Sequence, residues 1–182
     1  MGVTETYTPC GIVDEDTGEL FISFGSSYKT SDFIVDTLQA WWAKLTPTVR
    51  EHLPILQIKV DNGPENSGMR TQFLKRMVDW VDTIGKPVQL LYYPPYHSKY
   101  NPIERCWGVL EQHWNGTRLL NLPTMLVWAK SMQWKGTHPT IELNPLIYQR
   151  GIALTKPQME PIEARLERHP ALPKWDILIR PT

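Results

Sequence analysis

Residues 92–107 of the chain read YYPPYHSKYNPIERCW, and this stretch decides how the rest of the sequence is interpreted. It follows a short apolar run at 88–91 that has the character of a strand. Pro94 and Pro95 end that strand, because proline offers no N–H group to a ladder of hydrogen bonds. The stretch therefore predicts a stiff aromatic loop directly after a strand.

The second half of the stretch has the signals of a helix start. Asn101 suits the N-cap, Pro102 suits the first helical position, and Glu104 stands third, where a capping box places its carboxylate. Trp107 lies one turn further along the same face and is expected to pack beneath Glu104. Taken alone, this pattern is typical of a well-capped helix. A catalytic function for Glu104 requires a second carboxylate placed in a comparable way.

Composition sets the class of protein. The 182 residues are 41% hydrophobic and 21% charged, which suits a globular domain with a sizeable core. Lys+Arg and Asp+Glu are both 19, so a nucleic-acid partner would need a local basic surface. Cys10 and Cys106 form neither a metal spacing nor a disulfide framework, which fits a reducing cytoplasm. No apolar run approaches a membrane span, and the N-terminus has no signal pattern.

The elements upstream and downstream follow from periodicity and turn residues. A hairpin is predicted from 11–13 and 19–24, with its turn at 14–18, where Asp14 and Asp16 are better explained by turn chemistry than by metal binding. Further predictions are a helix at 30–45, a mostly buried strand at 55–60, a helix at 67–84 closed by Gly85, a strand at 88–91, and a helix at 102–114. Weaker patterns predict helices at 123–132 and 158–168, a turn at 133–136 and a strand at 175–179.

Asp61 is the candidate second carboxylate. It stands at the end of the best strand in the chain, and in open α/β sheets sites gather at that edge. The alternative is a hairpin turn at Asp61-Asn62-Gly63, which is disfavoured because a helix follows instead of a partner strand. One further strand and helix return the chain to the same edge at Glu104. Two carboxylates there can share Mg²⁺ ions, which prefer oxygen ligands.

Several polar and aromatic residues have supporting roles in this interpretation. His97 is a candidate for relaying a proton or contacting phosphate. The alternative is a solvated loop histidine with no such role. Lys99 and Arg105 are candidates for holding backbone phosphates. Tyr96 and Tyr100 either line a DNA groove and stack on bases or pack the loop.

Two motifs, VDNGPEN at 60–66 and the stretch at 92–107, closely resemble the DDE transposases of bacterial insertion sequences. The nearest match is the ISAzo13-like group, on the mariner-related side of that superfamily. Segments at 8–13, 29–36, 131–136 and 172–177 also look like that group, so the resemblance covers nearly the whole chain.

The resemblance implies an α/β fold of the RNase H-like kind, a mixed sheet with flanking helices, with the core at 1–118 and a C-terminal extension at 119–182 packed on it. It implies metal-dependent cleavage of DNA at transposon ends and joining to target DNA, with Mg²⁺ or Mn²⁺ as cofactor and two ions in the complete protein. The implied partners are DNA and further copies of the transposase, in the bacterial cytoplasm and at the nucleoid, with no membrane and no small-molecule substrate.

The motif match gives each site residue a role. Asp61 corresponds to the family's second acid and Glu104 to its third. Asn62, Gly63, Asn101 and Pro102 hold the loops that aim these carboxylates.

The family's first acid is expected on a strand before the hairpin, the central strand of an RNase H-like sheet. The sequence begins at Met1 just before that hairpin, and Asp14, Asp16 and Asp32 are poor substitutes because none lies on an apolar strand. The sequence therefore predicts the C-terminal catalytic half of a transposase, inactive alone. The alternatives are a non-catalytic remnant that only binds DNA or full-length transposase, and another RNase H-like nuclease.

Overall fold

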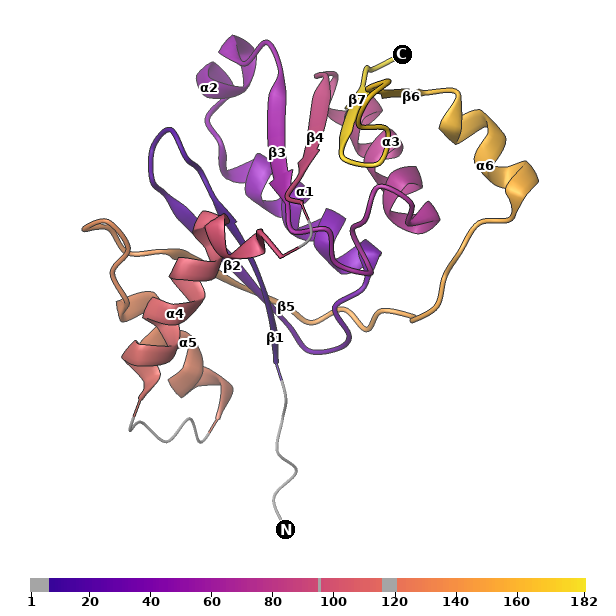
Figure 1. Ribbon diagram of the computed structural model, residues 1–182. Helices are drawn as coiled ribbons and strands as arrows, with labels where there is room; N and C mark the ends of the chain where they lie inside the picture. The colour runs from indigo at the N-terminus through magenta and orange to yellow at the C-terminus, as the bar shows by residue number, and fades with distance from the viewer. Residues whose placement is uncertain (1–6, 95, 116–120) are drawn as a thin grey trace. The chain divides into compact units, whose positions relative to one another are not determined.

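The computed structural model describes residues 7–94, 96–115 and 121–182. It has a mixed α/β architecture with two mixed sheets and flanking helices, compatible with the predicted fold class (Figure 1). The chain forms two compact units. The first joins the segment up to Lys29 with Pro102–Tyr148, and the second joins Thr30–Asn101 with Gln149–Thr182. The predicted division at residues 118 and 119 lies outside the described residues and stays a prediction.

The first unit is built on the predicted hairpin. β1 (Thr8–Val13) pairs antiparallel with β2 (Leu20–Gly25), and β2 pairs parallel with β5 (Thr140–Asn144) on its other side. The prediction that Asp14 is a turn residue is confirmed. Its Oδ1 accepts hydrogen bonds from the backbone N–H groups of Asp16 (2.9 Å) and Thr17 (3.1 Å). The Asp14 carboxylate therefore stabilises the turn.

Two helices pack on this three-stranded sheet, α4 (Pro102–Trp114) and α5 (Leu122–Ser131). Their buried residues join those of β2 and β5 in one apolar core: Leu20, Ile22, Phe24, Cys106, Leu110, Met125, Ala129, Met132, Trp134 and Ile141. α4 starts at Pro102 as predicted, and α5 starts one residue before the predicted position. The N-cap of α5 is Asn121, whose side chain accepts a hydrogen bond from the Thr124 N–H.

The second unit contains a four-stranded sheet in the order β3-β4-β7-β6. β3 (Leu56–Val60) and β4 (Val88–Tyr92) are parallel, whereas β7 (Asp176–Ile179) pairs antiparallel with both β4 and β6 (Leu166–Arg168). The parallel pair is the expected result of a strand–helix–strand crossover. The C-terminal segment thus supplies two of the four strands.

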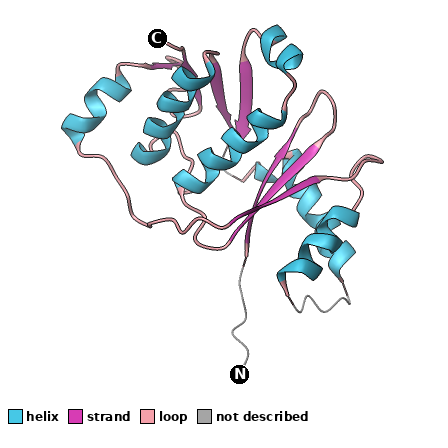
Figure 2. Cartoon of the chain, turned by 180° about the vertical axis from the view of Figure 1, so that it is seen from behind, coloured by secondary structure: helices cyan, strands magenta, loops and turns pink. Residues whose placement is uncertain are grey.

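The helices α1 (Ser31–Lys44) and α3 (Thr71–Ile84) pack against each other, and Figure 2 shows the helical layer over one face of this sheet. Thr30 caps α1 through its Oγ1, and Gly85 ends α3 in a left-handed conformation (φ 64°), as predicted. The buried side of α3 includes Phe73, Met77, Trp80 and Val81. On the opposite face of the sheet, Gln89 is hydrogen-bonded to Gln57 and Asp176.

Three predicted elements need correction. The strand ending at Val60 is not mostly buried, since alternate residues of β3 are exposed where it forms the edge of its sheet. The helix predicted from Ser67 begins at Thr71, so Met69 is exposed instead of packed. The helix predicted at 158–168 is α6 (Lys156–Glu163), which ends before β6 because Leu166–Arg168 pairs with β7.

The sequence prediction missed α2 (Pro47–His52), whose N-cap is Thr46, and β5. It also treated 98–100 as loop, where the chain forms a 3₁₀ turn, η1 (Ser98–Tyr100). Over the described ranges, no helix combines the length and apolar character needed to cross a membrane.

Candidate active site

Asp61 directly follows β3, at the carboxyl end of that strand. Its carboxylate is half-buried and is held on one side only. Oδ1 accepts hydrogen bonds from Asn66 Nδ2 (2.8 Å) and from the Gly63 N–H (3.3 Å). Among the described residues nothing donates to Oδ2. The loop therefore fixes one of the two carboxylate oxygens.

The loop that carries Asp61 has a special backbone. Asn62 is left-handed, with φ at 60°, a region in which asparagine is tolerated better than most residues. A Cβ on Gly63 would lie 3.3 Å from Asn66 Oδ1 and 3.5 Å from Asp61 Oδ1, so Gly63 lets the backbone approach the carboxylate. Both residues match positions predicted to hold this loop.

Glu65 anchors the loop to the start of α1. Its carboxylate accepts from the Ser31 N–H (3.2 Å) and Ser31 Oγ (3.1 Å), and forms an ion pair with Arg70 at 3.3 Å. Because these partners engage it, Glu65 is a structural anchor for the loop. Sequence reasoning missed it, although it stands inside the VDNGPEN motif.

Two side-chain oxygens of this loop receive no hydrogen bond from a described residue. Asp61 Oδ2 receives no hydrogen bond from a described residue, and Asn66 Oδ1 is buried without a partner in the described part of the chain. Carboxylate and amide oxygens can bind Mg²⁺ directly or accept hydrogen bonds from the waters bound to it. The described residues contain no cluster of three or more His, Cys, Asp or Glu side chains that could hold a metal.

Glu104 lies in the first turn of α4, which begins at Pro102 as predicted, and its side chain is exposed. The helix rests on β1 at Gly11, where a Cβ would come within 2.7 Å of Ile103 and 2.8 Å of Trp107. Trp107 therefore contacts β1 at Gly11, and its packing beneath Glu104 stays a prediction. Glycine at position 11 allows this close approach, which fixes the base of the helix that carries Glu104.

Four of the five residues predicted to contact DNA lie in an exposed aromatic and cationic loop, and the fifth, Arg105, lies on α4. Tyr96 is 96% exposed with a positive φ of 65°, and Tyr100 is 61% exposed. The rings of His97 and Tyr100 stack at 5.9 Å, and Lys99 Nζ lies 5.2 Å from the centroid of the Tyr100 ring. The stacked pair is loop packing, whereas contact of these rings with DNA stays a prediction.

The predicted site residues belong to both units. The second unit carries Asp61, Asn62, Gly63, Tyr96, His97, Lys99, Tyr100 and Asn101, and the first carries Pro102, Glu104 and Arg105. Asn101 is buried, whereas Arg105 is exposed on α4. The junction between the units thus falls inside the predicted Asn101-Pro102 helix start.

Asp32 is the remaining acid considered in the sequence. Arg76 donates to Asp32 at 2.6 Å and to Asp36 at 2.5 Å, and Gln72 donates to Asp32 at 2.9 Å. Asp32 is therefore committed to joining α1 and α3, in agreement with its dismissal as a catalytic acid.

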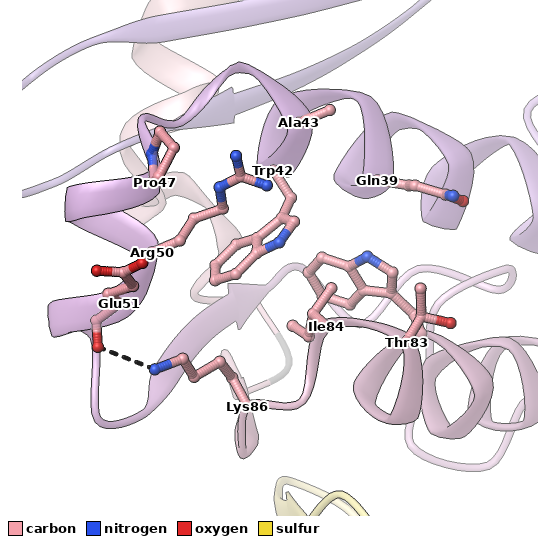
Figure 3. A pocket seen from close by; sticks show the side chains of 10 residues that line it. Gln39, Trp42, Ala43, Pro47, Arg50, Glu51, Thr83, Ile84 and Lys86 are labelled. Atoms are coloured by element: carbon pink, nitrogen blue, oxygen red, sulfur yellow. Dashed lines mark hydrogen bonds between the residues drawn. The ribbon is translucent and has the colours of Figure 1, made fainter.

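A separate hollow of about 570 Å³ lies near the other end of β3, between α1, α2 and α3 (Figure 3). Its apolar wall includes Trp42 and Trp80, whose rings meet edge to face at 6.3 Å. On its rim Lys86 Nζ donates to the Glu51 carbonyl oxygen at 3.0 Å (Figure 3). Asp61 does not line this hollow.

The family is identified by a match over residues 2–181 to the family described as Rhodopirellula transposase DDE domain. No curated protein and no solved structure matches the chain. The activity that this family implies is polynucleotidyl transfer in DNA transposition. Because the match spans nearly all 182 residues, the chain belongs to the DDE transposases, in the ISAzo13 group.

Proposed function

We propose that Asp61 and Glu104 hold divalent metal ions, Mg²⁺ or Mn²⁺, for cutting and joining DNA at transposon ends. The observation that carries this proposal is the state of the Asp61 carboxylate at the end of β3. Its Oδ1 accepts two hydrogen bonds from the loop, while no described residue donates to Oδ2. The resemblance of the motifs at 60–66 and 92–107 to those of the family supports the same assignment for Asp61 and Glu104.

Two bound ions would activate the attacking oxygen and stabilise the leaving oxygen of the phosphodiester. The protein itself supplies charged oxygens from two rigid supports. Asp61 is braced by the loop at 61–66, and Glu104 stands on a helix seated against Gly11. Asn62, Gly63, Asn101 and Pro102 set the backbone that aims these two side chains.

The exposed loop at 96–100 and Arg105 on α4 are the proposed DNA contacts. Lys99 and Arg105, which form no ion pair with a described residue, hold backbone phosphates. Tyr96 and Tyr100 stack on bases, and His97 contacts phosphate. Transposon ends and target DNA are the substrates, and self-association brings two ends together.

We also propose that an additional Asp-bearing strand, from a segment that precedes the hairpin, supplies the first acid. β3 is an edge strand, and its outer edge pairs with no described strand. Unpaired backbone groups along such an edge accept another strand readily. On this proposal the 182-residue chain alone lacks Mg²⁺-dependent nicking. The second candidate is a non-catalytic protein that binds DNA or full-length transposase.

A nicking assay on transposon-end DNA distinguishes these functions. We expect cleavage when the Asp-bearing segment is joined to the chain, and loss of cleavage in Asp61→Asn and in Glu104→Gln. Gln57→Ala, on the face of the sheet opposite α1 and α3, is the matched control and should cleave normally. Absence of cleavage by the joined protein, with end-DNA binding retained, would favour the non-catalytic function.

A further inference from the structure

The side chain of Asn66 is part of the support of Asp61, although the roles assigned to the residues of the VDNGPEN motif do not include it. Asn66 Nδ2 donates to Asp61 Oδ1 at 2.8 Å, the shorter of the two hydrogen bonds to that oxygen. The other comes from the Gly63 backbone at 3.3 Å and would survive any side-chain substitution. Rotation of the Asp61 carboxylate is therefore restrained mainly by one removable group.

The backbone of Asn66 is itself held from β4. The Tyr92 hydroxyl donates to the Asn66 carbonyl oxygen at 2.8 Å, and the Asn66 N–H donates to the Gly63 carbonyl oxygen at 3.2 Å. Tyr92 is buried, and this burial raises the pKa of its hydroxyl, which stays protonated and able to donate. The neighbouring Glu65 is tied to Ser31. These hydrogen bonds thus hold the backbone of Asn66 in place.

We propose that Asn66 is a positioning residue for Asp61, and that the Tyr92 hydroxyl fixes Asn66 in turn. Asn66 holds Oδ1 so that Oδ2 faces a divalent cation in one orientation. This inference rests on the proposed metal-binding function of Asp61. Residues that orient a metal ligand typically change metal affinity by about 10–100-fold when they are removed.

The test is Mn²⁺ binding, measured by electron paramagnetic resonance on the protein that carries the Asp-bearing segment, at a temperature well below its melting point. We expect Asn66→Ala to weaken Mn²⁺ binding by about tenfold or more. Tyr92→Phe should weaken it less, because the Asn66 amide remains in place. Circular dichroism spectra of both variants should match the unsubstituted protein.

Asn144→Ala is the matched control, since it removes a similar side-chain bond, from Asn144 Nδ2 to the Tyr148 hydroxyl at 2.6 Å, in the first unit. It should leave Mn²⁺ affinity unchanged. If Asn66→Ala binds Mn²⁺ as tightly as the unsubstituted protein while Asp61→Asn loses binding, the positioning role is wrong and the proposed site survives. If the unsubstituted protein and Asp61→Asn bind Mn²⁺ equally, or neither binds it, the proposed metal site itself fails.

Discussion

Arg168 Nη1 donates a hydrogen bond to the carbonyl oxygen of Gly68 at 3.0 Å, although the two residues lie 100 positions apart. The same nitrogen donates to the Pro173 carbonyl at 2.7 Å, and the guanidinium also pairs with Glu163. A Cβ on Gly68 would lie 2.3 Å from the Lys174 carbonyl oxygen. The C-terminal segment therefore packs directly on the loop that follows Asp61.

Removal of this contact should destabilise the second unit. Arg168→Ala leaves two backbone carbonyls without their charged donor, which we expect to cost roughly 1–3 kcal/mol in free energy of unfolding. The control is Arg180→Ala, because Arg180 and its partner Glu167 are both more than half exposed. That exposed pair should cost about 1 kcal/mol or less. Urea denaturation of both variants provides the comparison, and equal losses would contradict the account.

Seating of α4 on β1 requires glycine at position 11. Gly11→Ala brings a methyl group within 3 Å of Ile103 and Trp107, so the helix that carries Glu104 must shift. We expect a lower melting temperature and a cost of about 1–3 kcal/mol. Gly108→Ala, on the same helix with nothing within 4 Å, should instead stabilise by roughly 0.5–1 kcal/mol. Thermal denaturation measures both, and a neutral Gly11→Ala would show that α4 is not seated there.

The ion pair of Asp82 with Arg165 gives a pH dependence of stability. The Arg165 hydrogen bonds, and those from Thr182, lower the pKa of Asp82 from 3.8 to about 2. A carboxylate with a lowered pKa stabilises the fold above its unfolded value, and the contribution is lost as pH falls from about 4 towards 2. Because the pair is partly exposed, the effect should be about 1 kcal/mol or less.

Asp82→Asn should therefore lower the melting temperature at pH 6, and the difference from the unsubstituted chain should shrink between pH 4 and pH 2.5. Differential scanning calorimetry across that range checks the sign. A difference that grew on acidification would contradict the assigned direction.

Cys106 should be chemically inert in the folded chain. Burial raises the pKa of its thiol to about 12, and its side chain is fully inaccessible on the inner side of α4. Since the thiolate is the reactive species, alkylation by iodoacetamide at pH 8 should follow opening of the first unit. Mass spectrometry should show Cys106 labelled in urea and protected without it. Rapid labelling of the native chain would contradict the packing of α4.

Local signals in the sequence predicted the supports of the site well. Thr30 and Pro102 mark the starts of α1 and α4, and Gly85 marks the end of α3, because caps depend on residues within one turn. The hairpin β1–β2 and the turn at Asp14 follow from equally local chemistry.

Features that depend on distant partners were missed or misread. The helix predicted at 158–168 ends at Glu163, because Leu166–Arg168 forms β6 and pairs with β7. The functions of Glu65 and Asn66 depend on Ser31 and Tyr92, which lie 34 and 26 positions away. No pattern in a window of a few residues contains such partners.

The central proposal is that Asp61 and Glu104 are both ligands of divalent metal ions. Fe²⁺ substituted for Mg²⁺ tests it directly, because hydroxyl radicals generated with ascorbate and peroxide cut the backbone next to the bound ion. We use the protein that carries the Asp-bearing segment, with end DNA bound, and map the cuts by mass spectrometry. The account predicts cuts near both residue 61 and residue 104, with both sets lost in Asp61→Asn. Cuts near only one of the two residues, or cuts that persist in Asp61→Asn, would contradict it.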